Sequence, residues 1–158
     1  MIKPVRKLME LAIAEAKKAR GSGEYAIGAV VVKGNRVLAK AQHRTRRDCD
    51  PTQHAEMVAI RKASKVLGSR HLDGCVLYTT HEPCPMCAGA LVNARVARVV
   101  YGCDDPKAGA VRTLYAIGQD ARLNHRFELT AGVLGEACSN QLSGFFERVR
   151  KSRQSGAT

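Results

Sequence analysis

The chain has 158 residues, of which 45% are hydrophobic, a length and composition typical of one globular domain whose core needs no disulfide framework. Its six cysteines are therefore expected to be metal ligands and free thiols, and its formal net charge of +12 favours a polyanionic partner such as nucleic acid. Charged residues interrupt the apolar run near the N-terminus, which argues against a signal peptide or a membrane span and leads us to expect a cytoplasmic protein.

Hydrophobic periodicity predicts an alternation of helices and strands along the chain. Apolar residues from Val5 to Ala16 recur at helical spacing, and two β-branched runs at 26–32 and 37–41 flank a hairpin turn. A helix from Asp50, its expected N-cap, to Leu67 follows. The later elements are expected to be strands at 76–80, 96–101 and 127–133, and helices at 85–94, 108–117 and 134–150.

This order predicts an α/β fold with three layers, in which helices cover both faces of a mixed five-stranded sheet. The strands at 76–80 and 96–101 are expected to be parallel, because a helix connects them. We expect one domain over residues 1–151 and a disordered tail at 152–158.

Two short motifs carry the residues that suggest chemistry. Cys84 and Cys87 form a C-x-x-C pair, and the sequence offers no second pair to close a four-ligand structural zinc site. His54 is the best third ligand, which leaves the fourth position of the metal to water, as in catalytic zinc sites. Glu56 then supplies a group that can move protons. A structural zinc knuckle or a redox pair is the less specific alternative.

The surroundings of the motifs favour a shared ion. Pro85 opens a helix, so Cys84 and Cys87 lie at a helix N-terminus, where the helix dipole favours thiolates. His54 and Glu56 fall near the start of another helix. Because residues two apart point about 200° apart around a helix, both can face one ion only if that ion lies at the helix end.

H-x-E followed by P-C-x-x-C is a known signature of zinc-dependent nucleobase deaminases. With it, the chain resembles the cytidine-deaminase-like superfamily and, within it, the bacterial tRNA adenosine deaminases that make inosine at the anticodon wobble position. The resemblance runs from about Leu8 to Arg150. Its strongest segments are 50–56, 77–79, 82–91, 94–102, 105–110, 123–126 and 145–150.

The resemblance implies one zinc ion per subunit, held by His54, Cys84 and Cys87, with Glu56 as the catalytic residue. It implies attack of zinc-activated water on C6 of a flipped-out adenine, or on C4 of a cytosine-type ring, and release of ammonia. It also implies a homodimer that binds a tRNA anticodon stem-loop. The candidate substrate contacts are His43, Tyr25, Ala55, Asp105 and Lys107, and the candidate RNA contacts are Phe145, Phe146, Arg148 and Arg150.

Four positions depart from the family pattern. His43 stands where a purine-reading Asn is usual, Tyr25 and Ala26 replace Val-Pro beside the first strand, and His81 replaces an apolar residue. These changes keep open a second hypothesis, a deaminase of a free nucleobase or nucleoside of the guanine or cytosine type. A third hypothesis is a catalytically silent, zinc-containing RNA-binding subunit, against which the presence of Glu56 argues.

Overall fold

The computed structural model describes residues 3–156, which form four α-helices and five β-strands. In chain order these are α1 (Val5–Gly21), β1 (Gly28–Lys33), β2 (Arg36–Gln42), α2 (Ala55–Leu67), β3 (Cys75–His81), α3 (Pro85–Asn93), β4 (Arg98–Cys103), β5 (Glu128–Thr130) and α4 (Gly135–Ser155). The strands form one sheet in the order β2-β1-β3-β4-β5. β1 is antiparallel to β2 and β3, whereas β3, β4 and β5 are parallel, so the predicted mixed sheet is confirmed.

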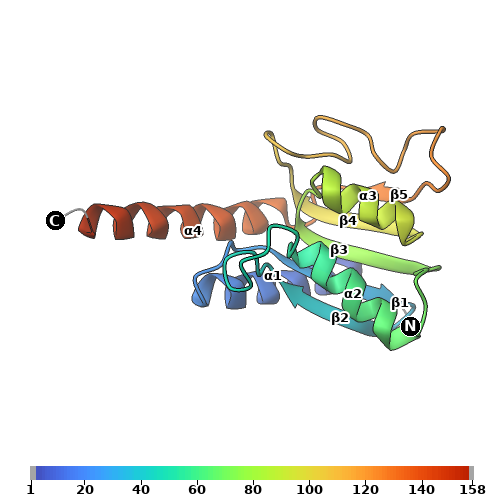
Figure 1. Cartoon of the computed structure of the whole chain (residues 1–158), viewed down its shortest axis with the longest axis horizontal. Coiled ribbons are helices and arrows are strands. Elements are labelled where there is room, and N and C mark those ends of the chain that lie inside the picture. The colour runs from blue at the N-terminus through green and yellow to red at the C-terminus, as the bar shows by residue number, and fades with distance from the viewer. Residues whose placement is uncertain (1–2, 157–158) are drawn as a thin grey trace.

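Helices cover both faces of this sheet (Figure 1). The side chains of β1 alternate between two cores: Ala29 and Val31 pack with residues of α2 and α3, whereas Val30 and Val32 pack with residues of α1. The continuous apolar run of β1 is therefore explained by burial on both faces. The predicted three-layer α/β/α architecture is confirmed.

Two glycines let α1 and α4 approach their face of the sheet closely. A Cβ atom at Gly28 would overlap with the backbone of α1, and one at Gly102 would overlap with the Cys138 side chain on α4. Only the first part of α4 packs against β3 and β4. The rest of the helix extends beyond the sheet (Figure 1).

The start of α2 differs from the prediction. Asp50 does not cap a helix; its Oδ1 accepts hydrogen bonds from the backbone N–H and the hydroxyl of Thr52, at 2.8 and 2.7 Å, and so closes a turn. The helix begins at Ala55, with His54 as its N-cap residue. Its predicted end is confirmed, because Gly68 adopts φ = 64° immediately after Leu67.

Three further expectations were wrong in part. Residues 108–117 form turns, not a helix, and β5 is shorter than the expected strand at 127–133. α4 continues to Ser155, so Ser152–Ser155 are helical, not part of a disordered tail; residues 157–158 lie outside the described part of the chain. Within residues 3–156, no helix combines the length and the apolar character needed to cross a membrane.

Candidate active site

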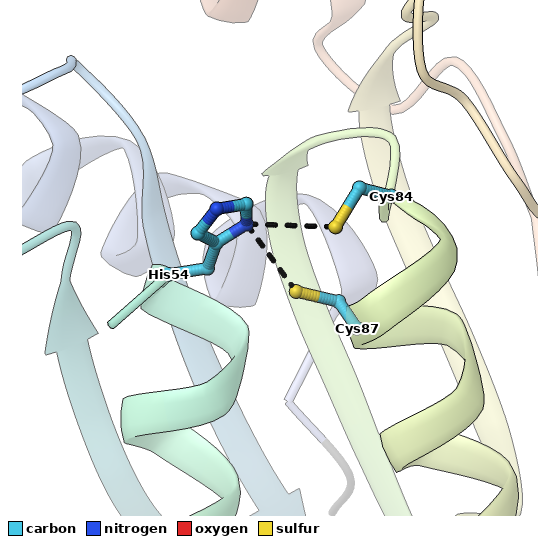
Figure 2. Close-up of side chains that lie close together, drawn as sticks. All are labelled: His54, Cys84 and Cys87. Carbon is cyan, nitrogen blue, oxygen red and sulfur yellow. Dashed lines mark hydrogen bonds between the residues drawn. The ribbon is translucent and has the colours of Figure 1, made fainter. Parts of the chain in front are cut away.

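The three expected metal ligands come together at the N-termini of α2 and α3 (Figure 2). His54 is the N-cap of α2, Cys84 is the N-cap of α3, and Cys87 lies in the first turn of α3. The Nδ1 atom of His54 lies 3.5 Å from the sulfur of each cysteine. The helical spacing of about 200° does not apply to His54 and Glu56, because His54 precedes the helix. Their side chains can therefore face the same site.

The cluster fits a zinc ion. Zn–S bonds of about 2.3 Å and a Zn–N bond of about 2.0 Å at a tetrahedral angle would place nitrogen and sulfur about 3.5 Å apart, which agrees with the observed separation. One imidazole and two thiols are also donors that zinc prefers. The hydrogen bond with Cys87 and the contact with His54 lower the pKa of Cys84, which favours the thiolate that a metal binds. The hydrogen bond with Cys84 and burial raise the pKa of Cys87.

Glu56 lies beside this cluster and is almost completely buried, with 4% of its surface exposed. Its Oε1 accepts a hydrogen bond of 2.9 Å from the Thr79 hydroxyl, and its Oε2 lies 3.6 Å from the sulfur of Cys87. Burial raises the pKa of Glu56, which makes this carboxylate a better proton acceptor. Thr79 was not predicted as a site residue, although a hydroxyl inside a buried strand was a signal that could have found it.

A pocket of about 440 Å³ is lined by His54, Cys84 and Glu56, and Cys87 lies buried behind this lining. His43 forms part of its wall: the ring packs against His54, with centroids 4.9 Å apart, and meets Tyr25 edge-on at 5.1 Å. The Nε2 atom of His43 lies 3.0 Å from the Thr45 hydroxyl. Burial, with smaller contributions from His54 and His81, lowers the pKa of His43 to about 4, so the ring is neutral at pH 7.

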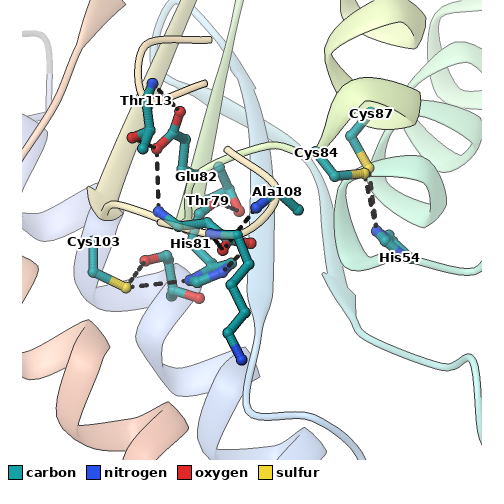
Figure 3. A network of polar contacts seen from close by, with 12 residues as sticks. His54, Thr79, His81, Glu82, Cys84, Cys87, Cys103, Ala108 and Thr113 are labelled. Carbon is teal, nitrogen blue, oxygen red and sulfur yellow. Dashed lines mark hydrogen bonds and ion pairs between the residues drawn. The ribbon is translucent and has the colours of Figure 1, made fainter. Parts of the chain in front are cut away.

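The other candidate substrate residues take different places. Asp105 lines the same pocket, where its carboxylate lies 3.0 Å from Nε2 of His81, which in turn contacts Cys103 (Figure 3). Lys107 is exposed and lines a neighbouring groove instead. Ala55 is fully buried in the core and is absent from the pocket lining, so its contact with a substrate stays a prediction.

The neighbouring groove, of about 1080 Å³, runs between the C-terminal end of α1 and α4 and shares Tyr25 and Phe146 with the pocket. The two candidate phenylalanines differ. Phe146 is 45% exposed, whereas Phe145 is 4% exposed and packs against Tyr25 with ring centroids 4.9 Å apart. The groove is strongly basic and is lined by Arg20, Arg46, Lys107, Arg148, Arg150 and Arg153.

Comparisons with known proteins agree with this site. Residues 5–150 match the MafB19-like deaminase family. The tRNA-specific adenosine deaminase of Bacillus subtilis (strain 168) is 47% identical over 146 residues, which cover 92% of this chain and 91% of that protein. A solved structure from work on A-to-I editing by tRNA:A34 deaminases has a TM-score of 0.83 and 40% identity, and covers 86% of this chain and 99% of that one.

A solved guanine deaminase of Bacillus subtilis is also similar, with a TM-score of 0.64 and 31% identity over 94% of this chain and 95% of that one. The expected cytidine-deaminase-like fold is thus confirmed. Since the family match and the tRNA deaminase relatives extend over most of the sequence, the chain belongs to the MafB19-like deaminase family, within the cytidine-deaminase-like superfamily and among the relatives of the tRNA-specific adenosine deaminases.

Proposed function

We propose that the protein is a zinc-dependent deaminase that converts adenosine to inosine at the wobble position of a tRNA anticodon and releases ammonia. The observation that carries this proposal is the place of Glu56, buried beside the His54, Cys84 and Cys87 cluster in a pocket that adjoins a basic groove. A purely structural metal site needs no such carboxylate. Glu56 therefore supports a catalyst over a silent RNA-binding subunit.

The chain supplies the proton transfers that hydrolytic deamination needs. A zinc ion bound by His54, Cys84 and Cys87 would act as a Lewis acid that makes water nucleophilic near neutral pH. Glu56 accepts a proton from the attacking water and delivers it to the ring nitrogen next to C6. It then helps a second proton reach the amino group, which leaves as ammonia while a carbonyl forms at C6.

The basic groove supports RNA as the substrate. Its six cationic side chains can neutralise backbone phosphates, while a flipped-out base enters the adjoining pocket. Phe146 is exposed and lines both cavities, so its ring can stack on a base at the junction. Lys107 lies in the groove and is assigned to the phosphates here. The proposal also includes a homodimer, which sedimentation would test, and the cytoplasm as the place of action.

A competition assay tests the proposal. Purified zinc protein is offered an anticodon stem-loop with adenosine at the wobble position together with free guanine, cytosine, adenine and their nucleosides, and the products are identified by mass. We expect inosine in the RNA, loss of this product in Glu56→Ala, and an unchanged product in Glu128→Ala, which alters an exposed carboxylate on β5. RNA that stays unmodified, or editing that persists in Glu56→Ala, would contradict the proposal.

A free nucleobase deaminase is the second candidate function. His43 favours it, because a neutral imidazole in the pocket wall cannot donate and accept from one edge as an Asn side chain can. The similarity to a guanine deaminase at 31% identity also supports it. In the same assay, deaminated guanine or cytosine beside unmodified RNA would select this function.

A further inference from the structure

Two carboxylates outside the metal cluster are more deeply buried than Glu56. Glu24 is 2% exposed and Glu82 is 1% exposed. Within residues 3–156, neither forms an ion pair with a basic side chain. A buried carboxylate without a cation needs strong hydrogen-bond donors, because the loss of hydration is otherwise costly. Both residues find these donors in the backbone of loops that border the pocket.

Glu82, which follows β3, is surrounded by the loop after β4. Its Oε1 accepts from the backbone N–H of Asp105 at 3.1 Å, and its Oε2 accepts from those of Arg112 and Thr113 at 3.1 and 3.0 Å. The Thr113 hydroxyl donates to the same carboxylate (Figure 3). The loop passes so close that a Cβ atom at Gly109 would overlap with this group.

Glu24, which precedes β1, holds the loop after β2 in a similar way. Its two carboxylate oxygens accept from the backbone N–H groups of Arg46, at 3.3 Å, and Arg47. The guanidinium of Arg46 also donates to the backbone carbonyl of Gly23 at 3.1 Å. Three polar contacts thus fix the segment that follows His43 and Thr45.

The two anchored loops form different parts of the pocket wall. The loop after β2 contributes His43 and Thr45, and the loop after β4 contributes Asp105 and Ala108. In the sheet order β2-β1-β3-β4-β5, these loops leave strands on opposite sides of β3. Neither loop is helical or extended, so hydrogen bonds of a ladder or a helix do not hold it. Each loop has turn hydrogen bonds of its own, and on each side one buried carboxylate adds contacts that tie several backbone N–H groups of the loop to a residue outside it.

We propose that Glu24 and Glu82 are positioning residues that fix the two walls of the pocket independently, Glu24 the wall with His43 and Glu82 the wall with Asp105. The effect on substrate rests on the proposed function, whereas the anchoring itself does not. When both walls are fixed before binding, less conformational entropy is lost as a base enters the pocket. A glutamine in either place would present an amide to backbone N–H donors and would lose acceptors while keeping the shape.

The test compares Glu24→Gln, Glu82→Gln and a control, Glu128→Gln, in the full-length zinc-loaded protein. Amide hydrogen exchange is measured by mass spectrometry over 44–48 and 104–113, together with zinc content and with KM and kcat on the stem-loop. We expect Glu82→Gln to speed exchange about tenfold or more in 104–113 alone, and Glu24→Gln to do so in 44–48 alone. Zinc content stays unchanged, and KM rises more than kcat falls.

A second pair of variants keeps the test decisive if a glutamine variant does not fold. Thr113→Val removes only the hydroxyl that donates to Glu82, and Gly109→Ala pushes a methyl group toward the same carboxylate. Faster exchange confined to 104–113 in either variant supports the anchor. Unchanged exchange in these variants, or equal acceleration of both segments by each glutamine variant, would overturn it. If no substrate is deaminated while the two loops respond separately, the anchors stand and the proposed function fails.

Discussion

The hydroxyl of Thr79 donates a hydrogen bond of 2.9 Å to Oε1 of Glu56 and so joins β3 to the first turn of α2. This contact leaves Oε2 of the carboxylate on the side of Cys87, 3.6 Å from its sulfur. Thr79 is fully buried, so the bond is shielded from water. The contact fixes the proposed proton-transfer group relative to the metal ligands.

Removal of this hydroxyl should slow the chemical step. We expect Thr79→Val to lower kcat about tenfold to a hundredfold, because a hydrogen bond to a charged group contributes about 1.5–3 kcal/mol. Thr79→Ser keeps the hydroxyl and should retain most of the activity. Steady-state kinetics on the stem-loop and zinc analysis check this expectation. Equal kcat values for the valine variant and the wild type would show that Thr79 does not orient Glu56.

Metal removal should abolish activity and lower the melting temperature. Zinc at a hundred times its dissociation constant stabilises the folded state by about 2.7 kcal/mol, which corresponds to about 5–10 °C in a chain of this size. Protons compete with the metal for His54 and the two cysteines, so affinity is retained at neutral pH and lost as the pH falls. A chromogenic chelator measures zinc release against pH.

The cysteines provide a matched control for the metal site. Cys84→Ser should lose zinc, whereas Cys49→Ser, which changes an exposed free thiol outside the cluster, should keep it. Both changes replace sulfur by oxygen. Full zinc content in Cys84→Ser would exclude that residue as a ligand.

The two adjacent phenylalanines of α4 should behave differently. Phe145→Ala removes a buried ring that packs against Tyr25 and should lower the free energy of unfolding by about 3–5 kcal/mol. Phe146→Ala removes an exposed ring and should change the free energy of unfolding little. It should weaken stem-loop binding about tenfold, because one base-stacking contact is lost. Thermal unfolding and fluorescence anisotropy separate the two effects. Equal RNA affinity in Phe146→Ala and the wild type would contradict the stacking role.

His43 should tolerate an amide but not an apolar side chain. Under the proposed function, His43→Asn should retain deamination of the stem-loop, since Asn can both donate and accept at a purine edge. His43→Leu should lower kcat/KM about tenfold or more, because a polar contact with the base is lost. If the wild type deaminates guanine and His43→Asn is inactive on RNA, the free nucleobase function is favoured.

The sequence by itself determined the chemistry of the site and the class of the fold. His54, Glu56, Cys84 and Cys87 could be identified because ligand type and spacing are local properties of the chain. The apolar runs of β1 and the end of α2 at Gly68 were likewise predictable, since periodicity and the left-handed preference of glycine are local.

Only the tertiary structure decided how the pocket is enclosed. The apolar pattern at 108–117 predicted a helix, but the backbone N–H groups of Arg112 and Thr113 bond to Glu82, which lies 30 and 31 residues earlier in the chain. Phe145 and Phe146 look equivalent in sequence and both contact the Tyr25 ring, yet only Phe145 is buried. Thr79, Glu24 and Glu82 acquired their roles in the same way. Such contacts join residues distant in the sequence, so no local pattern encodes them, and the packing of β-strands and loops selects them.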